Sequence, residues 1–560
     1  MRAASVDWRN RWGWNWITTT RNQAGAPNCW AFAATALYEA MVRIEHCVWC
    51  RRSEGDAARG AGKQAWDFGN VGEVSIFVER YGLTDPYCFP WSTFASIYSA
   101  KPHGTALSAL PLSPTPDRAG RTMRISPGHL TGLSDVEQKK TWIDAVGPMA
   151  VMVDPPADFG ALGSGIYTTV GPGAGMHALL VIGYDDPGGY WIVKNSWGPG
   201  WGVGGCGRVG YAANLLEPAS FIGARGTNPD PWTKRRQRNG NLIESGNGRW
   251  HNNFEIFLRK GLTIEHWWRE HGAPGFPWNR AEVVRSTDPY RDTFHDDCLE
   301  CPVAVQSTFN RNYELIYKNN VSNTLRHAYW DQASGNWYDA TAFGPTNPLG
   351  MPGFVQSTRG APGDFEVVVL NASGELEHWT KHNSAPWRAR KPGEWYLRSR
   401  FGSGIVDTGP ALVQSRNGIA GELEEGQGEL HFVCLGASGQ MQHYVLPPGQ
   451  AWTLVATFGT GAQSGPAMIE GAFAAKDELT AGNLELCIAH NAAIEHWWRN
   501  HTYKTWQRSA TFGSNVRCVV GMLQGSFGFN LELVVETLDL RYQHYWRDGA
   551  GWHQGVVFGP

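Results

Sequence analysis

The sequence lacks any apolar run approaching the about 18 residues that a membrane-spanning helix needs. It also lacks an excess of positive charge: charged residues make up 18% of the 560 residues, and the formal net charge is −3. Phosphate binding needs a basic face, so we expect neither a membrane span nor a nucleic-acid partner. Hydrophobic residues make up 42%, which is typical of a soluble globular protein.

We also expect no secretory signal within the given sequence, because Met1 to Val6 contain no apolar signal-peptide core. Ten cysteines nevertheless suit an oxidising compartment, and we expect an extracellular or secreted protein. The pairs Cys47-x-x-Cys50 and Cys298-x-x-Cys301 have no matching second pair at zinc-finger spacing. The sequence therefore predicts no metal and no cofactor.

The length favours at least two domains, since domains commonly hold about 100 to 200 residues. Residues 1–222 mix a helix-like stretch with apolar runs, whereas residues 241–560 show short strand-like runs separated by turn residues. Residues 223–240 contain turn-forming residues and the basic run Lys234 to Arg238. We interpret them as a solvated linker between two domains.

The second half contains six copies of one pattern. Each copy has a marker histidine near an aromatic residue: His266-Trp267, His327 with Tyr329, His378-Trp379, His443-Tyr444, His496-Trp497 and His544-Tyr545. A glutamate lies 11 to 14 residues upstream, at Glu255, Glu314, Glu366, Glu429, Glu485 and Glu532. A tryptophan lies downstream, at Trp278, Trp337, Trp395, Trp452, Trp506 and Trp552, and the last five copies then end in Phe-Gly.

An earlier strand-like start recurs as Val305-Gln306-Ser307, Val355-Gln356-Ser357 and Val413-Gln414-Ser415, so each copy has room for four strands. Four-stranded units of this length are how propeller blades appear in sequence. We predict an all-β propeller of six blades, with seven as the alternative.

In the first half, residues 29–41 are free of Gly and Pro, and Pro27 and Asn28 stand where a helix should start. Cys29 would lie at the positive end of that helix, where the dipole stabilises a thiolate. Such a cysteine alone is more often a buried structural residue. Its surroundings decide between the two interpretations.

The segment from Gln23 to Phe32 resembles the active-site segment of the papain family of cysteine proteases. Residues 175–184, with His177, resemble the histidine strand of that family, and residues 191–198, with Asn195 and Trp197, resemble its asparagine segment. The resemblance covers essentially residues 5–215 and implies an α+β fold with a helical subdomain and a β-barrel-like subdomain.

The resemblance implies a peptidase that works through a thioester. Cys29 would be the nucleophile, His177 its base, and Asn195 the residue that orients His177. Gln23 and the backbone N–H of Cys29 would stabilise the oxyanion. Trp197 would shield the Asn195–His177 hydrogen bond from water.

The resemblance also implies substrate contacts. The backbone of Gly69 would pair with an extended peptide, and Met149, Ala150 and Met176 would border an apolar pocket for the second residue before the cut. Position 26 is alanine where many members carry a disulfide cysteine, so Cys88 is expected to pair with Cys47 or Cys50. Cys206 has no evident partner.

The repeats resemble propeller lectins of the fucose-binding kind. The resemblance implies glycans or glycoproteins as partners besides peptide or protein substrates, with aromatic rings as sugar platforms. The candidate sugar-binding residues are His266, Trp267, His378, Trp379, His496 and Trp497. The simpler interpretation is that the repeated aromatic rings pack between blades.

Three hypotheses therefore remain. The first is a cysteine endopeptidase that its propeller targets to glycosylated substrates. The second is a carbohydrate-binding protein with an inactive protease-like domain, and the third is an acyltransferase that resolves the same thioester with an amine. The presence of Gln23, Cys29, His177 and Asn195 argues against the second.

Overall fold

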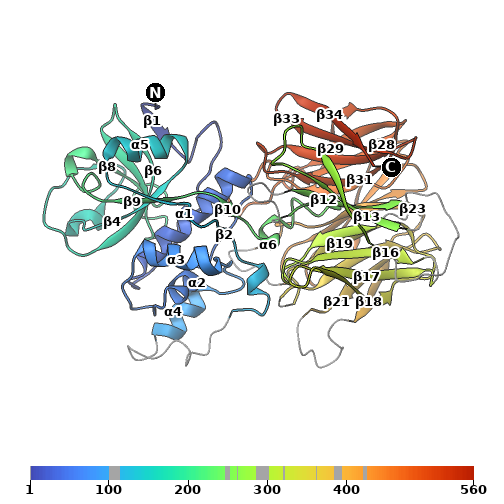
Figure 1. Cartoon of the computed structure of the whole chain (residues 1–560), viewed down its shortest axis with the longest axis horizontal. Coiled ribbons are helices and arrows are strands. Elements are labelled where there is room, and N and C mark those ends of the chain that lie inside the picture. Colours follow the sequence, from blue (N-terminus) through green and yellow to red (C-terminus); the bar gives the residue numbers. More distant parts are fainter. Residues whose placement is uncertain are drawn as a thin grey trace. The chain divides into compact units, whose positions relative to one another are not determined.

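The computed structural model describes residues 2–99, 114–245, 253–260, 263–284, 302–319, 322–360, 362–383, 394–419 and 426–559. The chain divides into two compact units (Figure 1). An N-terminal unit comprises Met1–Asp230 with Lys476–Glu478, and a propeller unit comprises the rest. No helix of the described residues combines the length and apolarity needed to cross a bilayer.

In the N-terminal unit, α2 and α3 pack against one buried helix, α1, which is almost entirely covered, whereas α5 packs against the sheet (Figure 1). Alanines and large apolar residues alternate along α1, and they allow neighbouring elements to pack on every side. Asn28 precedes α1, and Cys47 ends it in the left-handed conformation (φ 56°). The helices are α1 (Cys29–His46), α2 (Glu54–Gly60), α3 (Val71–Tyr81), α4 (Trp91–Ser99) and α5 (Val136–Ala145).

The sheet of this unit has the order β3-β9-β4-β6-β7-β8-β5, and β1 also pairs with β6. Eight of the nine residues of β6 are buried, which fits a central strand. The strands are β1 (Ser5–Asp7), β3 (Leu130–Leu133), β4 (Met149–Val153), β5 (Ile166–Tyr167), β6 (His177–Asp185), β7 (Tyr190–Lys194), β8 (Cys206–Gly210) and β9 (Phe221–Ala224); β2 (Arg124–Ile125) pairs separately with β10 (Thr227–Asn228).

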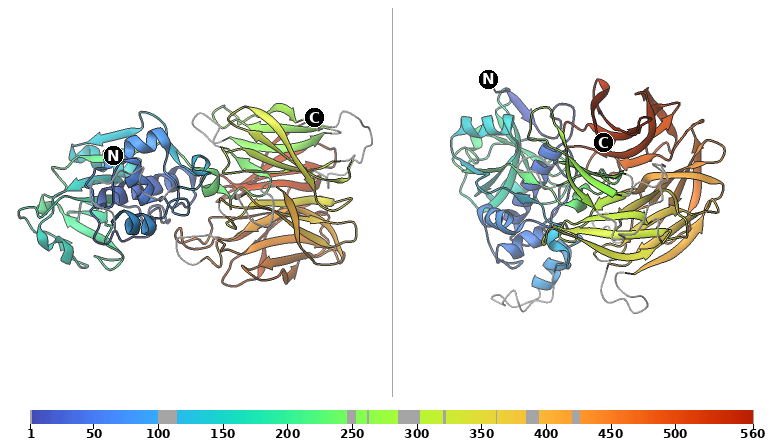
Figure 2. Two further views of the ribbon diagram at one scale, coloured as in Figure 1. Left: turned by 90° about the horizontal axis from the view of Figure 1, so that it is seen from below. Right: turned by 45° about the vertical axis from the view of Figure 1, so that its right-hand side comes forward.

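The propeller unit begins with helix α6 (Pro231–Lys234) and contains six four-stranded antiparallel sheets arranged as blades (Figure 2). The predicted α+β papain-like domain followed by a six-bladed propeller is confirmed, and the seven-bladed alternative is wrong.

The blade strands follow in chain order. Blades 1 and 2 are β11 (Leu242–Glu244), β12 (Phe254–Lys260), β13 (Thr263–Arg269), β14 (Trp278–Val284), and β15 (Val303–Gln306), β16 (Tyr313–Asn319), β17 (Thr324–Asp331), β18 (Asn336–Phe343). Blades 3 and 4 are β19 (Leu349–Gln356), β20 (Phe365–Leu370), β21 (Leu376–Lys381), β22 (Trp395–Phe401), and β23 (Ile405–Gln414), β24 (Leu430–Gly436), β25 (Met441–Leu446), β26 (Thr453–Phe458). Blades 5 and 6 are β27 (Ala467–Glu470), β28 (Leu484–His490), β29 (Ala493–Arg499), β30 (Trp506–Phe512), and β31 (Val516–Gln524), β32 (Leu531–Thr537), β33 (Tyr542–Asp548), β34 (Gly551–Phe558).

The repeated Phe-Gly and tryptophan form stacks between successive blades. Trp452 lies on Phe401 of the preceding blade, with ring centroids 4.5 Å apart and planes 8° from parallel. The same stack recurs for Trp395 on Phe343, Trp506 on Phe458, Trp552 on Phe512 and, where the ring closes, Trp278 on Phe558. The repeat therefore encodes packing between blades.

The recurring glutamine at the end of a blade's first strand bonds the threonine that follows the first strand of the preceding blade. Gln356 accepts from the backbone N–H of Thr308 (2.9 Å) and donates to its hydroxyl (2.8 Å), and Gln414 does the same with Thr358. At the ring closure, Glu244 of blade 1 accepts from the N–H of Ser526 in blade 6 (3.1 Å).

The basic run is buried within the propeller unit, so its interpretation as a solvated linker is wrong. Arg238 forms an ion pair with Glu244, and both side chains are at most 4% exposed. The backbone carbonyls of Arg236 and Gln237 accept from the N–H groups of Glu470 and Gln524. The positive charges neutralise a buried carboxylate, and the polar backbone is satisfied by first strands of the blades.

Blade 4 departs from the glutamate–histidine pattern. The sequence pattern predicts Glu429 as the glutamate of this blade. In the structure, His431 on β24 takes the position that the glutamate holds in the other blades, across from the strand of the marker histidine His443. Its Nδ1 lies 3.0 Å from Nε2 of His443. Sequence spacing could not reveal that a histidine replaces the glutamate, because Glu429 lies only two residues away. Its Oε2 is 3.4 Å from Nε2 of His431.

The predicted bridge from Cys88 to Cys47 or Cys50 is not formed. Cys88 and Cys50 both keep free, buried thiols. The sulfur of Cys88 instead accepts a hydrogen bond from Thr115 (3.1 Å). Cys206 is also a free, buried thiol, and Cys298 and Cys301 lie outside the described residues.

Candidate active site

The candidate nucleophile is the first residue of α1, as predicted. The carbonyl of Asn28 accepts from the N–H groups of Ala31 (2.9 Å) and Phe32 (3.2 Å), which closes the first turn of the helix around Cys29. The Cys29 side chain has little exposure, at 6% for the residue. The backbone N–H of Ala178, the residue after His177, donates to the Cys29 sulfur. This hydrogen bond favours the thiolate and lowers the pKa of the Cys29 thiol.

Two adjacent strands bring His177 and Asn195 together. His177 opens β6, Asn195 follows β7, and these strands pair antiparallel. Nε2 of His177 lies 2.7 Å from Oδ1 of Asn195, which also accepts from the N–H of Ser196 (2.8 Å). The amide oxygen is thereby fixed toward the ring, and Nε2 carries the donated proton, which leaves Nδ1 as the basic nitrogen.

Trp197 covers the histidine. Its ring stacks on His177 with centroids 4.4 Å apart and an interplanar angle of 27°. Phe159 and Trp201 pack edge-on against Trp197 on its other sides. This position fits the predicted shielding role.

Gln23 is held by the same segment as Asn195. The hydroxyl of Ser196 donates to Oε1 of Gln23, and the Gln23 backbone N–H donates to the Ser196 carbonyl (2.8 Å). Nε2 of Gln23 donates to the carbonyl of Ala26 (2.8 Å), which leaves a second amide hydrogen for another acceptor. Sequence reasoning missed Ser196 as the residue that orients Gln23.

Burial dominates the electrostatics of the two reacting groups. It raises the pKa of the Cys29 thiol above its usual 9.0, although nearby backbone N–H groups act in the opposite direction. It lowers the pKa of His177 to about 4, against the raising effect of the hydrogen bond with Asn195. Each group taken alone therefore favours its neutral form.

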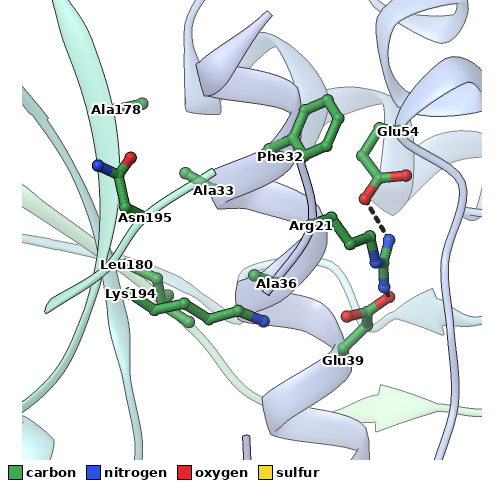
Figure 3. Close-up of a pocket in the computed structure, with 10 residues that line it drawn as sticks. All are labelled: Arg21, Phe32, Ala33, Ala36, Glu39, Glu54, Ala178, Leu180, Lys194 and Asn195. Atoms are coloured by element: carbon green, nitrogen blue, oxygen red, sulfur yellow. Dashed lines mark hydrogen bonds and ion pairs between the residues drawn. The ribbon is translucent and has the colours of Figure 1, made fainter. Parts of the chain in front are cut away.

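Beside Asn195 lies a small cavity between α1 and the strands, lined by both charged and apolar residues (Figure 3). Arg21 forms ion pairs with both Glu39 and Glu54, and Lys194 extends from the strand side toward Glu39 (Figure 3). The hydroxyl of Thr18 donates to Glu39 (2.6 Å) and accepts from Lys194 (3.0 Å).

This buried ion cluster includes residues from the segments of three of the four candidate catalytic residues. Arg21 precedes Gln23 by two residues, Glu39 lies on the helix that begins with Cys29, and Lys194 precedes Asn195. A signal for it exists in the sequence, where charged residues stand alone in the apolar segments of α1 and β7.

The predicted substrate residues differ in exposure. A methyl group on Gly69 would lie 2.7 Å from the ring of Trp30, which explains a glycine there. Met176 is 56% exposed, but Met149 and Ala150 are fully buried and present no surface to a bound peptide. Met152, on the same strand, is half-buried and pairs with Ala178 beside His177.

The predicted sugar-binding histidines are closed off inside the propeller. His266, His378 and His496 are at most 8% exposed, and each bonds its upstream glutamate at 2.7–2.8 Å. They are therefore wrong as ligand contacts, because a buried paired imidazole cannot reach a sugar. Trp267, Trp379 and Trp497 remain half-buried.

A comparison with protein families agrees with this geometry. Residues 2–217 match the model of the papain family cysteine proteases. The papain-like unit is 28% identical over 223 residues to cathepsin L2 of Homo sapiens, which covers 38% of this chain and 61% of that protein. It is 27% identical over 237 residues to ananain of Ananas comosus, which covers 40% and 60%.

The chain thus spans about three fifths of the length of these curated relatives. Among solved structures, the bromelain protease from Ananas comosus in complex with the E64 inhibitor matches with 25% identity and a TM-score of 0.31, covering 40% of this chain and 99% of that one.

Proposed function

We propose that the protein is a cysteine endopeptidase. The observation that carries the proposal is the arrangement of Cys29 at the start of α1 and the His177–Asn195 pair, 2.7 Å apart, under Trp197. The family match of residues 2–217 supports it.

In the proposed reaction, His177 takes the Cys29 proton and the sulfur attacks the carbonyl carbon of the scissile bond. The oxyanion accepts from the free amide hydrogen of Gln23 and from the Cys29 backbone N–H, each worth about 3 kcal/mol. His177 then gives its proton to the leaving amine as the C–N bond breaks. Water, deprotonated by His177, hydrolyses the thioester and restores the thiol.

The substrate preference follows from the exposed residues. Gly69 would pair with the extended peptide backbone, and Met176 offers apolar surface beside His177. Because Met149 and Ala150 are buried, we assign the apolar border of the pocket to Met152 instead. A hydrophobic second residue before the cut is the expected preference.

We further propose that the propeller binds carbohydrate and targets the peptidase to glycosylated, extracellular substrates. Support comes from a set repeated in blades 1, 3 and 5. A half-buried tryptophan donates through Nε1 to a glutamate (2.9 Å in each), and that glutamate bonds an arginine that is 54–57% exposed. The sets are Glu265, Trp267, Arg280; Glu377, Trp379, Arg400; and Glu495, Trp497, Arg508.

The test of peptidase activity uses a quenched dipeptidyl-amide substrate with an apolar second residue. We expect turnover that both Cys29→Ala and an epoxide thiol inhibitor abolish. No turnover from protein whose Cys29 stays unlabelled would favour the inactive binding protein. Products that carry an added amine instead of hydrolysed ends would favour the acyltransferase.

The test of sugar binding uses the full chain with Cys29→Ala on a glycan array. The full chain is required because the segment before residue 241 is part of the propeller unit. We expect binding that falls at least tenfold when Arg280, Arg400 and Arg508 are all changed to Met. If the array shows no binding, the sugar-binding proposal is wrong and the repeated rings serve only to pack the blades together.

A further inference from the structure

A second pocket of the papain-like unit lies apart from the catalytic residues. Its volume is about 280 Å³, and it lies between α2, α3 and the turn that contains Arg118. Its lining consists of Asp56, Arg59, Gly60, Phe77, Tyr81 and Arg118. None of these residues takes part in the proposed reaction.

The charges of the pocket do not balance. Arg118 is neutralised by Asp56 through two hydrogen bonds of 2.9 Å and 2.7 Å, and it also donates to the carbonyl of Gly82 (2.9 Å). Arg59 has no ion pair within the part of the chain that the structure describes, and its buried Nε makes no hydrogen bond there. One cationic group therefore remains available to an anion.

The walls of the pocket are aromatic. Phe77 and Tyr81 lie one helical turn apart on α3, with ring centroids 5.8 Å apart. Gly60 makes room for the Phe77 ring, because a methyl group on it would come within 2.3 Å of that ring. Tyr81 is 60% exposed, so a ring entering from solvent can reach it.

From these observations we infer that the pocket binds a small aromatic carboxylate. The carboxylate would pair with the guanidinium of Arg59, which suits planar oxyanions, and the ring would pack against Phe77 and Tyr81. A volume of about 280 Å³ lies just below the usual ~300–1,000 Å³ of ligand sites, which suits one ring with a short acidic chain. This inference does not depend on the peptidase proposal.

The experiment measures binding of 3-phenylpropanoate to the full chain with Cys29→Ala, by calorimetry and ligand-observed NMR. We expect the uncharged 3-phenylpropanamide to bind at least tenfold more weakly. Arg59→Met should weaken the acid at least tenfold and leave the amide unchanged. Arg80→Met is the matched control, because Arg80 is exposed on α3 and does not line the pocket.

A further variant separates the aromatic wall from the charge. Gly60→Ala displaces the Phe77 ring and should weaken acid and amide alike. Far-UV circular dichroism checks that each variant is folded. Equal affinity for acid and amide, undetectable binding of the acid, or unchanged binding in Arg59→Met would each overturn the inference.

Discussion

At the residue scale, neither Cys29 nor His177 ionises readily alone, and the two groups become charged only together. Burial raises the pKa of the thiol and lowers that of the imidazole to about 4, so a lone charge on either group is disfavoured. A proton moved from Cys29 to His177 creates both charges at once, and each then compensates the other. The reactive form is therefore a property of the pair.

The first prediction concerns the pH dependence of kcat/KM. The pair must hold a single proton, so activity should fall below about pH 4, where His177 takes up a second one, and above the usual thiol pKa of 9.0. Asn195→Ala removes the bond that raises the pKa of His177, so the acid limb should move to lower pH.

Stopped-time hydrolysis of the quenched substrate from pH 3 to 10 measures both limbs. Asn10→Ala, at an exposed asparagine, is the control and should leave the profile unchanged. An acid limb that moves upward in Asn195→Ala would contradict this account.

The second prediction concerns the ion cluster in Figure 3. Glu39→Gln leaves Arg21 and Lys194 buried without their shared carboxylate. Breaking such a buried network typically costs about 3–5 kcal/mol, so the free energy of unfolding of the papain-like unit should fall by that order. Urea unfolding followed by the helix signal measures it, since the long helices lie in this unit.

Glu137→Gln is the matched control for Glu39→Gln. The Glu137 carboxylate is 68% exposed in its pair with Arg2, and such a surface pair contributes about 0–1 kcal/mol. Equal losses in the two variants would mean that the cluster has no special role.

The sequence predicted Gln23, Cys29, His177 and Asn195 as candidate catalytic residues because thioester chemistry of this kind needs fixed residue types in a fixed order. It misplaced Met149 and Ala150 because a motif gives a strand but not its exposed positions. It also could not reveal that His266, His378 and His496 bond to glutamates, since a His-Trp pair looks the same in a core and in a binding site. Only burial separates the two.

At the scale of elements, the propeller is held together between blades as much as within them. The sequence repeats predicted the strands because each carries a Trp and most end in Phe-Gly. In the structure, the Trp of one blade stacks on the Phe of the preceding blade. The basic run was misinterpreted because a polar composition predicts exposure unless a buried partner is known. Its partner, Glu244, lies in the first blade strand.

The third prediction tests the stack between blades. Trp452→Ala removes the packing on Phe401 and the hydrogen bond from Nε1 to Nδ1 of His378 (3.2 Å). Large-to-small aromatic substitutions cost about 3–5 kcal/mol, and we expect a loss of that order in the propeller.

Near-UV circular dichroism during urea unfolding measures the effect of Trp452→Ala. Tyr503→Ala, at a residue that is 71% exposed, should change stability by less than about 0.5 kcal/mol. A decrease in the free energy of unfolding as small as that of Tyr503→Ala would show that the ring stacks are a result of the fold and do not stabilise it.

At the scale of the whole molecule, buried ionisable groups couple folding to pH. Burial lowers the pKa of His327, His378, His443 and His544 below the usual 6.5, and that of His501 to about 3. Below pH 6.5 these histidines bind protons in the unfolded chain but not in the folded chain. The free energy of unfolding therefore decreases as the pH is lowered. Burial raises the pKa of Glu536 to about 7 and also raises the pKa values of Glu45 and Asp364, and these three carboxylates oppose the trend.

Carboxylates extend the loss to lower pH. Burial alone would raise the pKa of Glu366 and Glu244, but their histidine and arginine partners hold both at about 2. Their contribution is complete above the usual 4.5 and is lost as pH falls toward 2. The histidines should therefore dominate between about pH 6.5 and 4.5, and the carboxylates below that.

The fourth prediction is that thermal unfolding begins at a lower temperature at pH 5.0 than at pH 7.0. His443→Gln should narrow the difference, because it removes one of the groups whose protonation favours the unfolded chain. Added salt should change the difference little, since the groups are buried and poorly screened. A transition temperature that is equal or higher at pH 5.0 would mean that the opposing carboxylates outweigh the histidines.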